Sequence, residues 1–563
     1  MIRLLSNAAL KHLLVLIRQV MASTGHELGN MATATAKGMQ APSTPHSEQV
    51  SNSEYTDSEQ LARLGKKSVL KRNFGFMSIL GFSCTILITW EATLVLSAQG
   101  LANGGPAGVL YGYLAVWLGN VSVFTTLSEL ASMAPTAGGQ YHWVAMLAPR
   151  RAARFLSYVT GWLTVAGWQG SVASSAFLTG TMVQGMVAMN RPDTYAPQSY
   201  QGTLLFWAVM LFAVVINAVV SSALPKFEGL ILVLHVLGFF AILIPMVSLG
   251  YHGDPHTVFT EFRNGGGWPT QGLSFMVGLI GNVFAFVGVD AAFHMSEETV
   301  NSAVTVPKSI FLSLLINGTT GFAMTIAVLF CIQDLESVLK SPTGFAHMQL
   351  FLDSTGSVAG STVMAAIITL LGACATVGML ASSSRVFWSF ARDRGLPFWR
   401  ILSQVDARTT VPLWAITCTT CIACLLALIN LGSATALNAV ISLSISCLYL
   451  SYFICASLLL YRRTTKGFQI PEASELPALA NTSGAELVCG PWHVPGALGI
   501  ANNAVSCIYL IVIFFFSFWP GMMNPGAKDM NWASAVTGLI LVFSIVYYVI
   551  WARKEYEGPI VEI

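Results

Sequence analysis

Three carboxylates lie within or at the end of long apolar stretches of this chain: Glu91, Glu129 and Asp290. A charged carboxylate at the centre of a bilayer costs about 2.5 to 3.5 kcal/mol on insertion scales, so each should face an interior cavity or a partner. Glu91 and Asp290 could therefore bind a cationic group of a substrate. Alternatively, they are structural carboxylates bonded to neighbouring hydroxyls or backbone amides, and both interpretations stay open.

Aromatic and small residues accompany these two carboxylates. Trp90 precedes Glu91, and Phe286 and Gly288 precede Asp290, while Trp168 lies in another apolar stretch. A tryptophan face can bind an ammonium group by cation–π attraction worth about 2 kcal/mol or more when dry. Most tryptophans of membrane proteins, however, sit at interfaces or pack between helices. The candidate substrate-binding residues are Thr89, Trp90, Glu91, Trp168, Phe286, Gly288 and Asp290.

Two further residues are candidates for proton coupling and gating. His235 lies well inside an apolar stretch, and an imidazole titrates near physiological pH, so we consider it together with Glu91 for proton coupling. A lone histidine on a helix is more often a packing residue. Glu129 comes just before the Pro/Gly turn at 134–139, where we expect it to anchor an inner gate rather than to contact substrate.

The composition shows which elements must position these side chains. Charged residues make up 10% of the chain, apolar types make up 54%, and the mean hydropathy is +0.65. This excludes a water-soluble fold, because soluble domains carry roughly 25% charged residues. The chain is expected to be an all-α polytopic membrane protein with twelve spans, near 77–98, 107–131, 155–189, 203–223, 228–249, 272–296, 309–332, 358–384, 411–429, 434–460, 501–520 and 532–552.

Lys and Arg predict the orientation of these spans, because they are retained on the cytoplasmic face. With the amino terminus inside, most of them flank the inner ends, and the outer loops carry only Arg191, Arg263, Lys340 and Lys528. We therefore expect both termini in the cytoplasm and residues 333–357 outside the cell.

The domain organisation follows from the same pattern. Residues 1–70 read as a disordered cytoplasmic tail, whose basic start is either a mitochondrial presequence or an overextended start before Met21 or Met31. Residues 71–555 form the twelve-helix domain, and 556–563 form a short cytoplasmic tail. Within the domain we expect two five-helix repeats and a peripheral helix pair, at about 74–250, 270–460 and 500–552.

Glu91 and Asp290 occupy corresponding positions in the first and sixth spans. Transporters built from inverted repeats break one helix in each half near the midplane, where backbone groups meet substrate and coupling ions. Gly288 makes the sixth span a good candidate for such a break. In the first span the break is expected at 89–93 or, alternatively, near Gly81.

Four stretches resemble a known family: 103–106 (NGGP), 129–143 (ELASMAPTAGGQYHW), 296–310 with its Ser-Glu-Glu and Val-Pro-Lys-Ser-Ile, and 384–397 (SRVFWSFARDRGLP). Over about residues 70 to 555 the chain resembles the amino acid–polyamine–organocation superfamily, in its fungal branch of amino acid, GABA and choline permeases. Many members have a glycine-rich break in the first span, whereas 89–93 contains no glycine.

The resemblance implies a five-plus-five inverted repeat, substrate between broken spans one and six, and proton-driven alternating access in a fungal membrane, expected to be the plasma membrane. Beside Trp90, Glu91 suits choline or another amine, because a quaternary nitrogen needs aromatic faces and an anion. GABA or another amino acid stays open, since amides at a half-helix amino end can hold a carboxylate.

Other function classes fit the sequence less well. An enzyme needs a cluster of catalytic or metal ligands, whereas the ten histidines are scattered. A channel needs repeated pore loops, and a non-transporting nutrient sensor is expected to carry longer cytoplasmic extensions. We therefore expect no enzymatic activity, no cofactor and no nucleic-acid partner. The expected partners are protons, the lipid bilayer and a small amine or amino acid.

Overall fold

The computed structural model describes residues 57–562 apart from 433, 466, 469–476 and 528, and the side chains of 432–442 are also outside the description. Within these residues the regular elements are helices, and the two β-bridges, Phe74–Thr299 and Ala480–Glu486, are isolated. The basic segment at the start of the sequence, read as a presequence or an overextended start, lies outside the described residues.

The helices fall into two successive groups and a final pair. The first group comprises α3 (Phe76–Leu87), α4 (Thr89–Met133), α5 (Gln140–Leu147), α6 (Arg150–Asn190), α7 (Ser199–Val214) and α8 (Leu224–Leu249). The second comprises α10 (Gln271–Phe284), α11 (Ala291–His294), α12 (Ser302–Cys331), α15 (Val358–Arg392), α17 (Leu413–Gly432) and α18 (Ala434–Thr465). The final pair is α19 (Gly496–Phe516) and α20 (Ala533–Ile550).

The membrane spans agree with the twelve that the sequence predicts. Among the described residues, 10 helices are long and apolar enough to cross a membrane. That number counts Phe76–Met133 as one stretch and leaves out the shorter α10. This stretch is two spans, because α4 has a non-helical residue at Gly105 (φ 66°, ψ −173°), followed by Pro106. Gly105 therefore separates spans one and two, while α10 and α11 form the sixth span.

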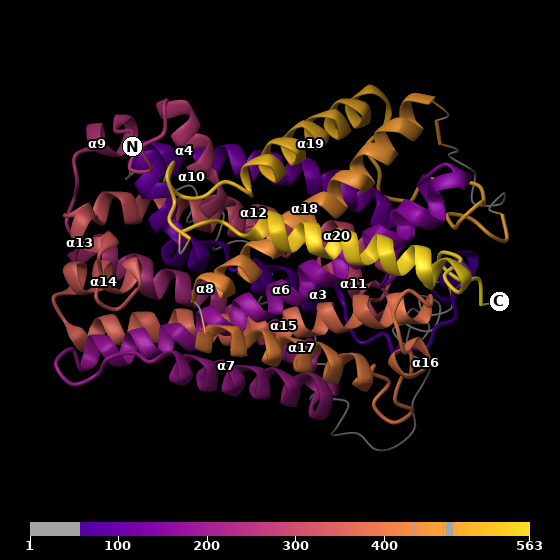
Figure 1. Ribbon diagram of the computed structural model, residues 1–563, viewed down its shortest axis with the longest axis horizontal. Helices are drawn as coiled ribbons and strands as arrows, with labels where there is room; N and C mark the ends of the chain where they lie inside the picture. Colours follow the sequence, from indigo (N-terminus) through magenta and orange to yellow (C-terminus); the bar gives the residue numbers. More distant parts are fainter. Residues whose placement is uncertain (1–56, 433, 466, 469–476, 528, 563) are drawn as a thin grey trace, which may run out of the picture. The chain divides into compact units, whose positions relative to one another are not determined.

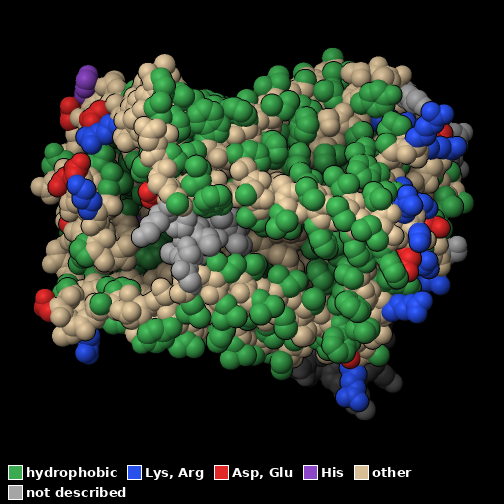
Figure 2. Space-filling view, viewed as in Figure 1, with side chains coloured by type: hydrophobic (Ala, Val, Ile, Leu, Met, Phe, Trp, Pro, Cys, Tyr) green, Lys and Arg blue, Asp and Glu red, His purple; other side chains and the backbone are tan. Residues whose placement is uncertain are grey.

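The long helices run side by side, with four short helices at their ends (Figure 1). Figure 1 shows α9 (Pro255–Thr260), α13 (Leu335–Leu339) and α14 (Ala346–Thr355) at one end, and α16 (Trp399–Leu402) at the other. Apolar side chains cover the sides of the helices, and Lys and Arg gather at the end with α16 (Figure 2). Exposed apolar residues such as Leu204, Leu237 and Leu539 suit contact with lipid tails.

The third span is one continuous helix. The sequence leaves open whether its long apolar stretch is a tilted helix or carries an extra helical piece outside the lipid. In the structure, α6 runs without interruption from Arg150 to Asn190, over 41 residues. Its length places Ser171 and Ser175 in the middle of the bundle, opposite the first span, where both side chains are buried.

The folded part of the chain begins earlier than the expected boundary at residue 70. Leu61 and Leu64 are buried, and the Lys66 ammonium pairs with the Asp393 carboxylate, both fully enclosed. Although burial favours the neutral acid, Lys66 and Arg392 hold the pKa of Asp393 below its usual value. A buried charge pair orders the chain around it, so this segment is not a free tail.

The carboxyl-terminal residues pack against the same region. The buried Tyr556 hydroxyl is 2.6 Å from the Ser157 hydroxyl, and the Ile560 amide donates to Asp393 over 2.9 Å. The expected short tail at 556–563 is therefore folded over its described residues.

Candidate functional site

The first span breaks at Ile88. Helix α3 ends at Leu87, Ile88 adopts a left-handed conformation (φ 36°, ψ 42°), and α4 begins at Thr89. Such a backbone is rare for a β-branched residue and costs of order 1 to 3 kcal/mol, and strain of this kind clusters at ligand sites. The break directly precedes Thr89, Trp90 and Glu91, so it lies one residue before the expected range of 89–93.

The alternative break at Gly81 is not observed. Gly81 lies inside α3, where it is buried and helical. A Cβ atom on Gly81 would lie 2.6 Å from the Glu228 carbonyl oxygen. The glycine is therefore required because the backbones of α3 and α8 touch, and not because the helix ends there.

The sixth span breaks between Phe284 and Ala291. Helix α10 ends at Phe284, Gly288 has a φ of 102°, and α11 begins at Ala291. A Cβ atom on Gly288 would also lie 2.9 Å from Cγ2 of Ile86, just before the other break. Gly288 thus supplies both the positive φ and the room for the two broken helices to meet.

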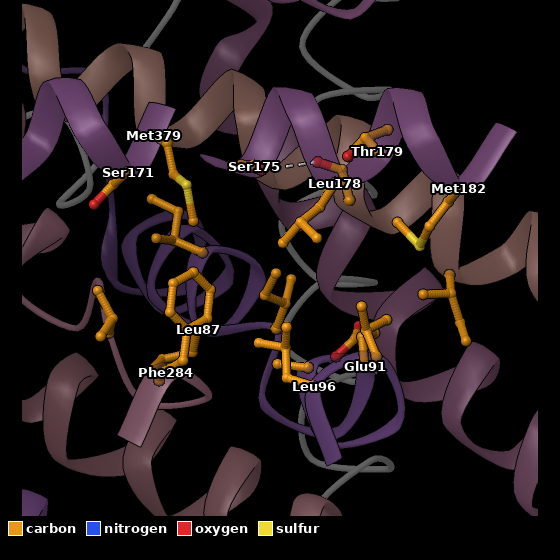
Figure 3. A pocket seen from close by; sticks show the side chains of 17 residues that line it. Leu87, Glu91, Leu96, Ser171, Ser175, Leu178, Thr179, Met182, Phe284 and Met379 are labelled. Carbon is orange, nitrogen blue, oxygen red and sulfur yellow. Dashed lines mark hydrogen bonds between the residues drawn. The ribbon is translucent and has the colours of Figure 1, made fainter. Parts of the chain in front are cut away.

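A cavity of about 50 Å³ lies beside the two breaks. Figure 3 shows Ser171, Ser175 and Thr179 of α6 on one side and Glu91 of α4 on the other. The cavity is much smaller than the roughly 300 to 1,000 Å³ of ordinary ligand sites, so it must widen to accept a substrate. The residues that line it are Ile86, Leu87, Ile88, Glu91, Ala92, Val95, Leu96, Ser171, Ser175, Leu178, Thr179, Met182, Phe284, Val287, Ile368, Gly372 and Met379.

Glu91 is the charged residue of this lining, and it pairs with His235. Its Oε1 lies 2.8 Å from Nδ1 of His235 of α8, and both side chains are buried. Glu91 Oε2 and His235 Nε2 have no hydrogen-bond partner among the described residues. The Trp90 ring lies 5.6 Å from the imidazole and 6.1 Å from the Phe239 ring. The sequence thus named three residues that the fold brings together, although Trp90 covers His235 rather than the cavity.

Asp290 lies in a separate polar cluster. Its Oδ2 accepts hydrogen bonds from Gln140 Nε2 at 2.9 Å and from Trp168 Nε1 at 3.1 Å. His294 Nε2 approaches the same oxygen at 3.6 Å. Asp290 and Trp168 therefore meet, but neither lines the cavity. Sequence reasoning missed Gln140 and His294, although His294 follows Asp290 by one helical turn.

The remaining candidates lie away from the cavity. Phe286 packs on Tyr113 with ring centres 5.4 Å apart, and Thr89 is buried against α12 next to Gly321. Glu129 accepts hydrogen bonds from Arg463 Nη2 and from the Val494 amide, each at 2.5 Å. Glu129 thus ties the end of α4 to the end of α18. This geometry suits an anchor, and its gating role stays a prediction.

Two features of the structure were missed from the sequence. The hydroxyl residues 171, 175 and 179 recur every four positions, which puts them on one face of α6, so helical periodicity was the available signal. Glu228 is fully buried in α8, and both its oxygens lack a hydrogen-bond partner among the described residues. Glu228 is the first residue of the expected fifth span, and a carboxylate at such an edge is ordinarily interpreted as part of a flanking loop.

Comparisons with known proteins identify relatives of this chain. A model of a family described as amino acid permease matches residues 74–543. The chain is 31% identical to a choline transporter of Saccharomyces cerevisiae over 493 residues, which cover 87% of this chain and 83% of that protein. It is 24% identical to amino-acid permease 2 of Neurospora crassa, over 93% of this chain and 92% of that protein.

A solved structure shows the same fold. The crystal structure of a manganese transporter of Eremococcus coleocola matches with a TM-score of 0.51 and 13% identity, covering 85% of this chain and 94% of that chain. At this identity the likeness concerns the fold alone. It confirms the all-helical fold that the sequence predicts.

Proposed function

Because the chain belongs to the amino acid permease family, we propose that it imports choline or a related small amine together with a proton. The observation that carries this proposal is the position of Glu91. Its carboxylate directly follows the break in the first span, lines the cavity and pairs with His235.

The charges of the cavity favour a cationic substrate. Neither Lys nor Arg is among the lining residues, so no side-chain cation there is available to a substrate carboxylate. Glu91 also lies in the first turn of α4, where it already supplies the negative charge that a helix amino end attracts. The name of the Saccharomyces cerevisiae relative, a choline transporter, supports the same substrate class.

The Glu91–His235 pair makes the charge at the cavity sensitive to protons, which supports a proton rather than sodium as the coupling ion. Two titratable groups in direct contact share their protons as a pair. Any change in the protonation of His235 therefore changes the charge that Glu91 presents to a substrate. We expect neither sodium nor a cofactor to be required.

Uptake by vesicles that contain the purified full-length protein tests this function. Labelled choline should accumulate when the outside is more acidic than the inside, and a protonophore should abolish the accumulation. Unlabelled choline should compete more strongly than GABA, polyamines or single amino acids. Uptake that ignores the pH gradient and requires sodium would contradict the proposal.

An amino acid or GABA is the second candidate substrate. No side chain caps the amino end of α4, so its first amide groups are available to a carboxylate. The Neurospora crassa relative is named as an amino-acid permease. If this alternative holds, GABA or an amino acid will displace labelled choline at a lower concentration than choline itself does.

A further inference from the structure

Glu228 is a buried carboxyl that the proposed substrate site does not use. It precedes His235 by seven residues on α8, which is two helical turns and therefore the same face. His235 meets α4 after the break in the first span. The backbone at Glu228 meets α3, before that break, because a Cβ atom on Gly81 would lie 2.6 Å from the Glu228 carbonyl oxygen. Helix α8 thus touches both halves of the broken span, at Glu228 and at His235.

The Glu228 side chain is enclosed between α8, α3 and α15. A Cβ atom on Gly378 of α15 would lie 3.5 Å from Glu228 Oε1 and 2.8 Å from Cγ1 of Ile86 of α3. Gly378 therefore leaves room for the carboxyl beside α15, and Gly81 lets the backbones of α3 and α8 touch next to it. The exposed fraction of Glu228 is 0%.

The hydroxyl groups of α3 do not satisfy this carboxyl. Ser83 donates to the Ile79 carbonyl at 2.8 Å, and Thr85 donates to the Gly81 carbonyl at 2.7 Å. Both Glu228 oxygens lack a hydrogen-bond partner among the described residues. The nearest titratable groups that α3 and α15 contribute are the buried thiols Cys84 and Cys374.

The charged groups on helices around α8 are engaged or directed elsewhere. Arg385 and Arg392 of α15 pair with Glu298 and Glu297, and Glu91 of α4 pairs with His235. Lys226 of α8 and Lys308 of α12 are exposed.

Helix α14 meets the opposite end of α8, where Gly250 approaches Ser354. Its titratable residues, His347 and Asp353, therefore belong to that end. Helix α7 has no charged residue.

Such surroundings require a neutral carboxyl. An ionised carboxylate buried without a partner costs several kcal/mol, whereas the protonated acid avoids most of that cost. Glu228 therefore holds a proton while α3 packs against α8. If α3 moves away, water reaches the carboxyl and it can ionise, so the proton and the contact between the two helices are thermodynamically linked.

A proton site apart from Glu91 is also needed for import of a cation with a proton. A substrate ammonium at Glu91 and a proton on His235 would place two positive charges next to each other, and each would weaken the other's binding. The Glu228 carboxyl is neutral when it carries a proton, and it lies on the other side of the break from Glu91. The proton can therefore travel with the cation without repelling it.

We propose that Glu228 is the proton-binding site of transport, protonated while α3 packs against α8 and deprotonated when the two helices separate. Helix α3 is the half of the first span nearest the Lys- and Arg-rich end, which is the expected cytoplasmic side. Separation there releases the proton inward. This inference rests on the proposed proton-coupled uptake and adds the group that carries the proton.

The test compares Glu228→Gln with the exposed control Glu336→Gln in vesicles, using labelled choline. At zero membrane potential and an imposed difference of about one pH unit, one coupled proton supports at most about tenfold accumulation. Wild type and Glu336→Gln should accumulate choline up to this limit. Glu228→Gln should lose the accumulation, yet keep choline exchange between the two sides within about twofold, because exchange needs no net proton movement.

The accumulation and the folding of Glu228→Gln decide whether Glu228 carries the proton. If Glu228→Gln still accumulates choline with the wild-type dependence on pH, Glu228 does not carry the proton. If Glu228→Gln fails to fold, the site is not neutral, because glutamine has the shape of the protonated acid, and the inference is also overturned. Glu228→Asp, which keeps a titratable group, should retain part of the accumulation. If the wild type itself ignores the pH gradient, the proposed function fails rather than this assignment alone.

Discussion

The two broken spans carry one carboxylate each beside the break, but the surroundings of these carboxylates differ. Glu91 follows the first break and lines the cavity, and each of the two carboxylates has one oxygen without a partner among the described residues. Asp290 precedes the second helical segment of span six, and Gln140 and Trp168 both donate to one of its oxygens. Asp290 is absent from the lining of the cavity.

Two carboxylates that both lie beside a helix break therefore need not share a role. A carboxylate whose hydrogen bonds go to protein donors holds neighbouring helices in place, here α5, α6 and the break of span six. A carboxylate with a free oxygen at a cavity can bind a ligand cation. We therefore assign substrate binding to the first break and a structural role to the second.

The largest expected effect is that of Glu91→Gln. The change keeps the shape of the side chain and removes its charge, and a hydrogen bond or contact with a charged group is worth about 1.5 to 3 kcal/mol, or about tenfold to hundredfold. We expect apparent affinity for labelled choline to fall by about hundredfold in vesicle uptake. A neutral or zwitterionic competitor should lose less. Normal choline affinity in a folded Glu91→Gln protein would show that the site lies elsewhere.

Trp90→Ala should have a smaller effect. The Trp90 ring lies against His235, so its loss removes both a π face near the carboxylate and the packing of the imidazole. A dry cation–π contact is worth about 2 kcal/mol, which corresponds to roughly thirtyfold in affinity. Trp90→Phe keeps a weaker π face and should lose less than Trp90→Ala in a choline binding assay. Equal losses in the two variants would indicate that Trp90 acts only through packing of the indole.

Asp290→Asn should have the smallest effect on binding. The amide oxygen of asparagine can still accept hydrogen bonds from Gln140 and Trp168, so we expect the choline affinity to change by less than about threefold. Thermal unfolding of the purified protein monitors the structural role. Asp290→Ala, which leaves both donors unpaired, should unfold at a lower temperature than Asp290→Asn. An affinity loss in Asp290→Asn as large as that of Glu91→Gln would remove the distinction between the two breaks.

Much of the fold could be predicted from the sequence, because apolar stretches of about twenty residues indicate spans regardless of how they pack. The position of Trp90 and Glu91 beside a broken helix could also be predicted, since a carboxylate inside a membrane is costly unless it faces a cavity or a partner. The break itself lies at Ile88, which no glycine or proline marks. Only tertiary packing imposes a left-handed backbone on such a residue.

Contacts between distant segments could not be predicted. Nothing in one sequence shows that His235 of the fifth span lies 2.8 Å from Glu91 of the first, because the distance depends on how α8 packs. Glu228 was missed for a related reason. A glutamate at the start of an apolar stretch is ordinarily a flanking residue, and its complete burial results from close approach of α3 and α15.

A structure of the purified protein with bound choline, determined by electron cryo-microscopy, would show directly whether Glu91 binds the substrate. We expect the quaternary nitrogen to lie in the widened cavity next to the Glu91 carboxylate and within about 6 Å of an aromatic ring, with Trp90 as the expected one. We also expect Asp290 to keep its bonds to Gln140 and Trp168 in that state. Choline bound against Asp290, with Glu91 still facing only His235, would show instead that the substrate site lies at the second break.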